Sequence, residues 1–256
     1  MSDIKVIILA GQGESTRLMF NGIKDSFSIQ KVIIEASVQK KQLLIRRLKR
    51  LGLSTVIGQV LFMVYNSIWL KNRSQKRINR IKNKEKLNDK NIDEAIVSMV
   101  DSINSDKTKE ILKEYRPDVV VVNGTRIIKK EIIEAIDAPF VNTHVGITPK
   151  YRGVHGGYWA LTNNDIEHCG VTIHLVDTGI DTGDVLFQDI IEITNNDNFN
   201  TYPYLQMAAA IPLMTKAINE IANKTYKAQK VDLPSKLWSH PTIMQYLKYR
   251  ILQGVK

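Results

Sequence analysis

A run of four valines inside Asp118–Asn123 (DVVVVN) places the tightest limit on what this chain can fold into. An uninterrupted β-branched run is typical of a strand that is buried on both faces, as in a parallel sheet covered by helices. Lys5–Ala10 (KVIILA) has the same character and is followed by Gly11 and Gly13, which predicts a first buried strand that turns into a helix. The chain is therefore expected to build an α/β sheet.

Strands and helices alternate through most of the remaining sequence. Alternation of this kind implies a doubly wound, mostly parallel sheet whose ligand crevice lies at the carboxyl ends of the strands. Pro212 should make the last helix start late or kink. The pattern predicts further strands over Ile29–Ile34, Phe140–His144, Gly170–Asp177 and Asp184–Ile193, and helices from Asp106 to about Tyr115, from about Lys129 to Ile136 and over Leu205–Asn223.

Length and composition agree with one large globular domain. The chain has 256 residues, of which 43% are apolar and 24% charged, and this excludes a disordered chain and a multi-span membrane protein. Its single cysteine, Cys169, cannot form an intramolecular disulfide and is expected to be a small core residue rather than a nucleophile. The N-terminal residues lack the basic region and cleavage site of a secretory signal, so we expect a cytoplasmic protein.

The net charge of +10 is concentrated in two segments. Residues 40–50 carry six Lys or Arg and no acid, and residues 71–90 carry nine against two acids, so the rest of the chain stands at −3. A surface that tracks nucleic-acid phosphates needs a continuous basic face. The distribution therefore argues against a nucleic-acid partner.

The region around these basic clusters leaves several structures open. Gln39–Arg50 has leucines at helical spacing among basic residues, which predicts an amphipathic helix. Leu51–Leu70 has no charged residue over 20 positions; it fits a buried or partner-packed helix, a transmembrane helix, an amphipathic helix on an anionic membrane, or a homodimer surface. Lys71–Lys90 is expected to be a solvated helix or a mobile loop. Peripheral membrane association through residues 40–90 is therefore one expectation.

The glycines of the segment ILAGQGESTRL, at residues 8–18, match no phosphate-binding motif. The segment lacks the GK[ST] of a P-loop, and its spacing does not fit GxGxxG. A tight turn after the first strand is expected. Contact with a substrate phosphate is the alternative, because helix N-termini attract anions.

Two glycine-rich segments, residues 141–157 (VNTHVGITPKYRGVHGG) and 176–186 (VDTGIDTGDVL), carry the residues best suited to chemistry. Asn142 and His144 lie two apart at the end of a predicted strand, so their side chains should emerge together at the crevice. Asp181 follows in the second segment. An amide donor, an imidazole and a carboxylate on loops at strand ends predict an acyl-transfer site that uses neither a metal nor a serine nucleophile.

At these motifs the sequence resembles the folate-dependent formyltransferases, from about Ser102 to Asn223. The segments NTHVGITPKYRG, GVTIHLVDTGIDTGDVL and DVVVVNGTRII carry the resemblance, although the loop reads GITP where the family commonly has SLLP. The resemblance implies a Rossmann-like sheet, 10-formyltetrahydrofolate as co-substrate, no metal, and Asn142, His144 and Asp181 as the catalytic residues.

In the chemistry that the resemblance implies, an acceptor amine attacks the formyl carbon and Asn142 donates an N–H to the oxyanion. His144, charged through Asp181, would stabilise that oxygen further, and Asp181 would orient His144 or a water that removes the amine proton. The expected domains are a catalytic one over residues 1–225, with a helical, basic insertion at about 39–105, and a short C-terminal extension over 226–256.

The resemblance also assigns expected binding residues. The other histidines, His168, His174 and His240, are expected to be surface or satisfied core residues. The acceptor is expected to contact Lys150, Tyr151, Arg152 and His155. The donor's pterin ring is expected to lie against Gly124, Thr125, Arg126, Ile127 and Ile128 and against Asp177, Thr178, Gly179 and Ile180.

The acceptor is expected to be a nucleotide-linked amino sugar, a precursor of surface polysaccharides. Members of the family that formylate initiator tRNA carry a C-terminal barrel for which the tail is too short, and formyltetrahydrofolate hydrolases place a regulatory domain first. Glycinamide ribonucleotide, aminoacyl-tRNA and water are the alternative acceptors. The tail aromatics Trp238, Tyr246 and Tyr249 would stack on a base or sugar, or cover the core. A membrane-docking protein without catalysis is the non-enzymatic alternative.

Overall fold

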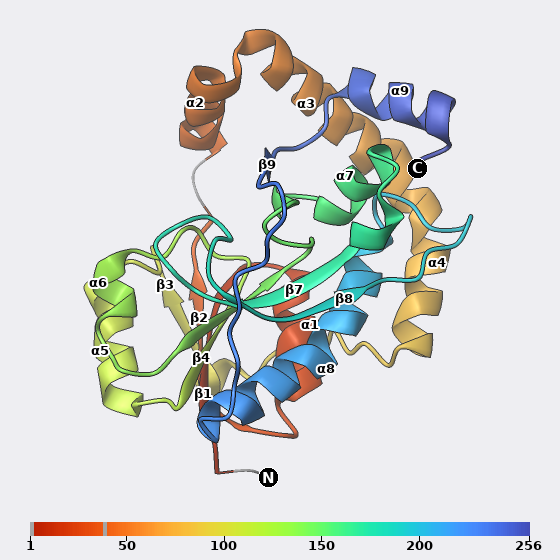
Figure 1. Cartoon of the computed structure of the whole chain (residues 1–256). Helices are drawn as coiled ribbons and strands as arrows, with labels where there is room; N and C mark the ends of the chain where they lie inside the picture. Colours follow the sequence, from red (N-terminus) through yellow and green to blue (C-terminus); the bar gives the residue numbers. More distant parts are fainter. Residues whose placement is uncertain (1–2, 38–39) are drawn as a thin grey trace.

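The computed structural model describes residues 3–37 and 40–256. Its centre is a seven-stranded sheet in the order β3-β2-β1-β4-β5-β7-β8 (Figure 1). Neighbouring strands from β3 to β5 are parallel, whereas β7 runs antiparallel to both β5 and β8. The strands are β1 (Lys5–Gly11), β2 (Ser28–Glu35), β3 (Val97–Val100), β4 (Val119–Asn123), β5 (Phe140–His144), β7 (Gly170–Leu175) and β8 (Val185–Ile190).

Helices cover both faces of this sheet, which confirms the predicted doubly wound α/β fold (Figure 1). They are α1 (Glu14–Ile23), α5 (Asp106–Tyr115), α6 (Lys130–Ile133), α7 (Gly156–Thr162) and α8 (Tyr202–Ala222). Alternate residues of β1 point to opposite layers. Val6 and Ile8 pack with residues of α1 and α8, whereas Ile7 and Leu9 pack with residues of α5 and α6. The sheet is therefore buried on both sides, as the valine run predicts.

The helix before the C-terminal tail differs from its prediction. α8 begins at Tyr202 rather than Leu205 and continues through Pro212, so the prediction that Pro212 delays the start of this helix was wrong. Pro203 lies in the first turn, where the missing N–H of a proline breaks no helical hydrogen bond. Burial of Met214 and Ala217 against the sheet holds the part after Pro212 in place. The helix expected from about Lys129 to Ile136 is shorter and forms only α6.

Residues 40–84 of the predicted insertion fold into α2 (Lys40–Leu51) and one long helix along the rim of the domain (Figure 1), whereas Val97–Val100, near its predicted end, is strand β3 of the central sheet. The long helix comprises α3 (Leu53–Tyr65), a π-helical turn (Asn66–Leu70) and α4 (Lys71–Lys84). Its inward side chains are buried, namely Val56, Gln59, Phe62, Ser74, Ile78 and Ile81. The uncharged segment is thus packed on one side, and Lys71–Lys84 is a half-covered helix rather than a mobile loop.

The C-terminal tail returns to the segment before α7 and to α3. β9 (Leu237–Trp238) pairs with β6 (Arg152–Gly153), and α9 (Ile243–Gln253) packs on α3. Tyr246 is fully buried, with its ring 5.0 Å from that of Phe62. Trp238 stacks on Trp159 at 4.8 Å. Tyr246 therefore covers the core and is not available to stack on a ligand.

Candidate active site

β5 brings the first two predicted catalytic residues to one face of the sheet. Asn142 and His144 are two residues apart on this strand, and His144 is buried. The neighbouring strand β7 pairs antiparallel with β5, so that Asn142 lies opposite His174 and His144 opposite Thr172. Residues directly opposite each other in such a pair point to the same side. His174 is therefore placed beside Asn142 by strand register alone.

Asp181 reaches this face from the loop between β7 and β8. Its backbone has φ +50°, and its side chain is only 15% exposed. Its Oδ2 lies 3.3 Å from Nδ1 of His144 and accepts a 3.0 Å hydrogen bond from the backbone N–H of Gly153. Its Oδ1 lies 3.4 Å from Nδ2 of Asn142. The structure thus brings Asn142, His144 and Asp181 into one cluster.

Two opposing effects set the ionisation of Asp181. Burial raises the pKa of this carboxyl, but its interactions with His144, with His174 and with the backbone N–H of Gly153 outweigh burial and lower the pKa to about 2. Asp181 is therefore an ionised carboxylate at neutral pH.

His144 departs from the expected charged state. Burial lowers its pKa and outweighs the Asp181 carboxylate and the Tyr151 carbonyl, both of which raise it. Nε2 must carry a proton, because it donates to the backbone oxygen of Tyr151 at 2.7 Å and a carbonyl only accepts. Nδ1, which faces Asp181, is then the nitrogen that is free to take a proton. The expectation of a charged imidazole was wrong for the free protein, since desolvation favours the neutral ring.

The amide of Asn142 is oriented by His174, which was expected from the sequence to be a surface or satisfied core residue. His174 Nδ1 donates to the carbonyl of Leu175 at 2.7 Å, so its Nε2 is an acceptor, and it receives an N–H of Asn142 at 3.0 Å. The second N–H of Asn142 points to Asp181 at the longer distance of 3.4 Å. That weakly held hydrogen is the one that a substrate oxygen can take over.

Glycines keep the loops close to these side chains. A Cβ on Gly146 would lie 2.8 Å from Nε2 of His144 and 2.5 Å from the carbonyl of Tyr151. Gly153 has φ +96°, and a Cβ there would meet the carbonyl of Trp238 at 2.3 Å. Both sites therefore require glycine for the loop to approach His144 and the tail.

The predicted donor-binding loop, residues 124–128, is held by a buried carboxylate. Glu35 accepts the backbone N–H of Arg126 at 2.6 Å and that of Ile103 at 3.1 Å, and it also forms an ion pair with the Arg126 guanidinium. Ile127 is half exposed, whereas Ile128 is buried in the core. Ile128 and the guanidinium of Arg126 thus have structural roles, and the exposed parts of the loop are Gly124 and Ile127.

The second predicted donor-binding segment, residues 177–180, is a closed turn. Asp177 accepts the backbone N–H of Gly179 at 2.9 Å and the hydroxyl of Thr182 at 2.8 Å. The carbonyl of Ile180 accepts from Arg152 at 3.1 Å. Thr178 and Gly179 are exposed. The turn is held by its own side chains and presents its backbone to solvent.

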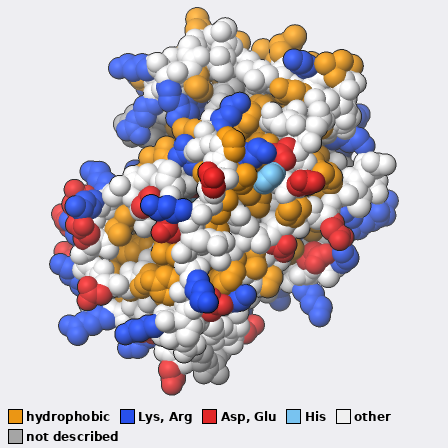
Figure 2. All heavy atoms as spheres, in the orientation of Figure 1, with side chains coloured by type: hydrophobic (Ala, Val, Ile, Leu, Met, Phe, Trp, Pro, Cys, Tyr) orange, Lys and Arg blue, Asp and Glu red, His pale blue; other side chains and the backbone are white. Residues whose placement is uncertain are grey.

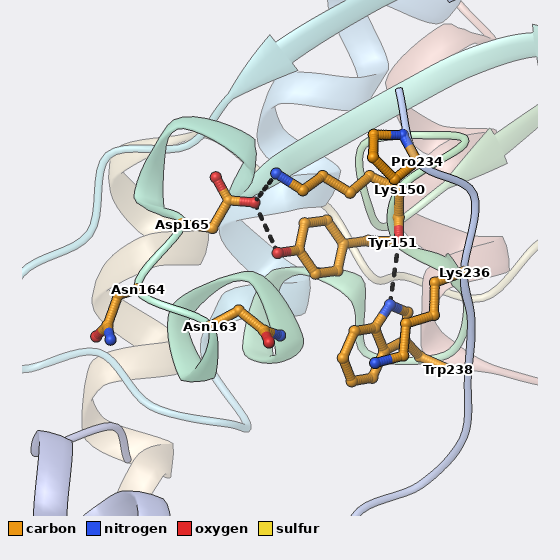
Figure 3. A pocket seen from close by; sticks show the side chains of 8 residues that line it. All are labelled: Lys150, Tyr151, Asn163, Asn164, Asp165, Pro234, Lys236 and Trp238. Carbon is orange, nitrogen blue, oxygen red and sulfur yellow. Dashed lines mark hydrogen bonds and ion pairs between the residues drawn. The ribbon is translucent and has the colours of Figure 1, made fainter. Parts of the chain in front are cut away.

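Two of the four predicted acceptor-binding residues belong to a different hollow from the catalytic cluster. Figure 3 shows Lys150 and Tyr151 pointing to Asp165, with distances of 2.6 and 2.7 Å from their polar atoms to Oδ2. This hollow, of about 440 Å³, is also lined by Lys236 and Trp238. The side chains of Lys150 and Tyr151 are thus committed to Asp165; only the backbone carbonyl of Tyr151 reaches His144.

The other two acceptor-binding candidates have different partners. Arg152 donates a hydrogen bond to the carbonyl of Ile180 and so helps to hold the turn at residues 177–180. His155 lines a second cavity, of about 310 Å³, and its Nε2 lies 2.9 Å from Nδ1 of His240. Burial lowers the pKa of His155 to about 3 and that of His240 to about 4, so both are neutral near pH 7. His240 is thus a satisfied core residue, as expected, while His174 belongs to the site.

The cluster suits addition to a carbonyl. It offers an N–H donor on Asn142, a neutral imidazole able to take one proton at Nδ1, and an ionised carboxylate that can stabilise the imidazolium so formed. The two acceptor oxygens facing the imidazole match the two N–H groups of its protonated form. These groups can shuttle a proton between two nitrogens while a carbonyl oxygen is held.

Comparison with known proteins agrees with this chemistry. A sequence profile described as formyl transferase matches residues 30–209. The methionyl-tRNA formyltransferase of Clostridium beijerinckii is 33% identical over 134 residues, which cover 48% of this chain and 43% of that protein. That of Nitratiruptor sp. is 40% identical over 116 residues, which cover 45% of this chain and 37% of that protein. The match thus spans less than half the length of these two relatives.

Solved structures share the fold. A sugar N-formyltransferase from Shewanella sp. has a TM-score of 0.57 at 16% identity, covering 92% of this chain and 76% of that one. Phosphoribosylglycinamide formyltransferase from Anaplasma phagocytophilum has 0.58 at 16%, covering 93% and 100%. An N-formyltransferase from Helicobacter canadensis, in complex with folinic acid and dTDP-3-aminofucose, has 0.55 at 21%, covering 92% and 71%. At these identities the likeness concerns the fold alone.

Proposed function

Because this chain belongs to the formyl transferase family, we propose that it moves the formyl group of 10-formyltetrahydrofolate to the amino group of a nucleotide-linked amino sugar. The observation that carries the proposal is the buried cluster of Asn142, His144 and Asp181, in which each ring nitrogen of His144 faces an acceptor oxygen. Asn142, His144 and Asp181 are proposed as the catalytic residues, and His174 as a positioning residue that acts through Asn142.

The proposed chemistry follows from the protonation states. The acceptor amine attacks the formyl carbon, and the carbonyl oxygen, as it gains charge, takes the N–H of Asn142 that is held at 3.4 Å by Asp181. The proton lost by the amine passes to Nδ1 of His144, directly or through a water. The imidazolium is stabilised by the Asp181 carboxylate and then returns the proton to the leaving nitrogen. The products are a formamide and tetrahydrofolate.

The donor is proposed to lie along the exposed backbone of residues 124–127 and 177–180. Gly124 has φ +69°, with open space where a Cβ would stand, so the backbone there is accessible to a flat ring. Thr178 and Gly179 are exposed on the second segment. The Glu35 and Asp177 hydrogen bonds fix both segments before binding, which lowers the entropic cost of holding the donor.

The acceptor is proposed to enter the 310 Å³ cavity that His155 lines. Aromatic side chains of Phe199 and Tyr204 offer faces for a sugar or base, Asn200 an amide for hydroxyls, and Lys71 a cation for phosphate. Ser15, in the first turn of α1, lines the same cavity, so the phosphate contact expected for this turn as an alternative also belongs to the proposal. This mixed lining favours a nucleotide-linked sugar over a large polyanion.

The test measures tetrahydrofolate release from 10-formyltetrahydrofolate with a panel of nucleotide-linked amino sugars. Wild type is compared with His144→Ala and Asp181→Ala, and with Asp189→Asn, a change of an exposed carboxyl on β8. Sugar-dependent release that both alanine variants lose and Asp189→Asn keeps would support the proposal. Release without any amine would indicate a hydrolase, and release only with glycinamide ribonucleotide would replace the acceptor.

A further inference from the structure

The outward face of α3 is apolar, the reverse of an ordinary surface helix. Spacings of three and four residues place its exposed apolar side chains on one side of the helix. Each of them is between 40% and 66% exposed. We call these residues the outer stripe: Leu53, Ile57, Val60, Leu61, Val64 and Ile68.

The inward face of the same helix is fixed to the domain, so the outer stripe cannot be turned inward. Gln59 is buried and donates to the carbonyl of His240 at 2.7 Å. The ring of Phe62 packs edge-on against that of Phe199, with the ring centroids 4.9 Å apart, and lies tilted against the ring of Tyr246 with the centroids 5.0 Å apart. By length and composition the long helix could cross a membrane, with 22% of the apolar window buried. Crossing would break these contacts, so the helix stays with the domain.

Basic residues flank the outer stripe on both sides in the sequence. Between Ala36 and Lys84 the sequence has 13 Lys or Arg and no Asp or Glu. On α2, which adjoins α3, Arg46, Lys49 and Arg50 are exposed together with apolar neighbours at 43–45. Figure 2 shows orange side chains along the upper edge of the molecule, over these helices, with blue side chains next to them.

We propose that α2 and the outer stripe dock this protein on an anionic lipid bilayer, as a peripheral protein. Exposed aliphatic side chains flanked by lysine and arginine bind the boundary between headgroups and acyl chains. There the aliphatic side chains are removed from water and the cations lie close to anionic headgroups. A second copy of the chain is disfavoured as the occupant, because pairing two faces that each expose Arg46, Lys49 and Arg50 would bring like charges together. Trp69, 54% exposed and 5.7 Å below the Arg73 guanidinium, suits the headgroup level.

The first experiment sediments the full chain with phosphatidylcholine vesicles that contain or lack phosphatidylglycerol. We expect binding to the anionic vesicles, weakened by salt, and little to the neutral ones. The variant Ile57→Gln/Leu61→Gln/Val64→Gln should bind about tenfold more weakly or worse, because its apolar insertion is lost. The matched control changes three apolar side chains of similar exposure elsewhere, Met99→Gln/Ile166→Gln/Ile190→Gln, and should bind like wild type.

The second experiment removes charge while the stripe stays intact. Arg46→Ala/Lys49→Ala/Arg50→Ala should weaken binding to anionic vesicles by about a hundredfold, at roughly fivefold for each cation near the surface. Its control, Lys113→Ala/Lys130→Ala/Lys227→Ala, removes three exposed cations on other parts of the domain. Circular dichroism checks that all variants keep their helix content. Equal binding by both charge variants, or equal binding to neutral and anionic vesicles, would overturn the proposal.

Two measurements distinguish peripheral membrane docking from a dimer of the chain and from a helix that spans the membrane. Light scattering without lipid reports a second copy: a dimer that the stripe variant dissociates would overturn membrane docking. Protein that stays with vesicles after alkaline carbonate extraction would show a spanning helix and also overturn a peripheral mode. Tryptophan emission should shift to shorter wavelength with anionic vesicles, and Trp69→Phe should abolish the shift; a shift that persists would place the contact elsewhere.

Discussion

The proposed catalytic cluster and the long helix expose polar and apolar groups in opposite ways. Around Asp181 the polar side chains are largely buried, and Asn142, His144 and His174 all have hydrogen-bond partners. Along the outward side of α3 and the π-helical turn the apolar side chains are exposed, and six of them form the outer stripe. Satisfied buried polar groups are costly to assemble and are kept where they serve chemistry. Exposed apolar groups in a row are kept where another surface covers them.

The two regions also differ in what a single residue contributes. In the cluster, each side chain fixes the protonation or orientation of another, so a change spreads to its neighbours. In the outer stripe, each side chain is between 40% and 66% exposed, so a change there should leave the rest of the domain in place. The helix α3 allows the two cases to be compared, because its adjacent residues Leu61 and Phe62 face opposite ways: Leu61 is 53% exposed and Phe62 1%.

The largest expected effect compares Phe62→Ala with Leu61→Ala. Phe62 is 1% exposed and packs on two aromatic rings, so its removal should lower the free energy of unfolding by about 3–5 kcal/mol. Leu61 is 53% exposed, and its removal should change the free energy of unfolding by no more than about 0.5 kcal/mol. Urea denaturation of both variants measures this. Similar losses would mean that the outer stripe is packed in solution, contrary to the comparison.

Asp181→Asn should have the next largest effect, confined to catalysis. The amide keeps the shape but not the charge that stabilises the imidazolium of His144, so kcat should fall by about a hundred- to a thousandfold. Vesicle binding should be unchanged, because the hydrogen bonds and ion pairs of Asp181 are made with residues outside the outer stripe. Steady-state release of tetrahydrofolate measures the rate, with Asp189→Asn as the control. Activity close to wild type would remove Asp181 from the proposed proton path.

Glu35→Gln tests the support of the donor segment. The amide can still accept one backbone N–H but loses the ion pair with Arg126, and we expect a loss of about 2 kcal/mol in stability. The KM for the donor should rise more than kcat falls, because the loop at 124–128 is looser before binding. Glu114→Gln, at an exposed site on α5, is the control. A fall in kcat alone would place Glu35 in the chemical step instead.

The sequence predicts a feature well when residues close together in the chain determine it, and poorly when residues far apart in the chain do. The valine run specifies β4, and the spacing of Asn142 and His144 specifies a shared face. His174 was missed because its place beside Asn142 depends on the antiparallel register of β7 against β5, which no local pattern encodes. Glu35 was missed for the same reason, since its partners lie 68 and 91 residues away.

The outer stripe shows a different limit. Both faces of α3 are apolar, so Ile57 and Leu61 cannot be told from Val56 and Phe62 by composition. Only the tail and α8, which pack on one of the two faces, decide which becomes the core. The sequence could therefore offer a buried helix, a membrane surface and a dimer face as alternatives but could not choose among them.

The smallest expected effect concerns His240, where the two regions meet. Its ring contacts His155, which directly precedes α7, and its carbonyl accepts from Gln59 of the long helix. Burial, with a smaller contribution from Arg47, lowers the pKa of His240 from 6.5 to about 4, so below pH 6.5 the unfolded chain binds a proton that the folded chain refuses. Stability should thus be full above pH 6.5 and fall as the pH drops toward 4, by about 1.4 kcal/mol per pH unit for this group.

His240→Gln removes this titration and should make the decline of stability between pH 6 and pH 4.5 shallower, by up to about 1.4 kcal/mol per pH unit. Denaturation at pH 8, where His240 is neutral in both states, measures the cost of the substitution itself and serves as the control. His155 has a pKa near 3 for the same reason of burial, so part of the decline should persist in the variant. An unchanged slope of stability against pH would mean that acid breaks the contact between His240 and His155 before His240 titrates. The tail would then be less firmly joined to the domain than the contacts of Gln59 and Phe62 indicate.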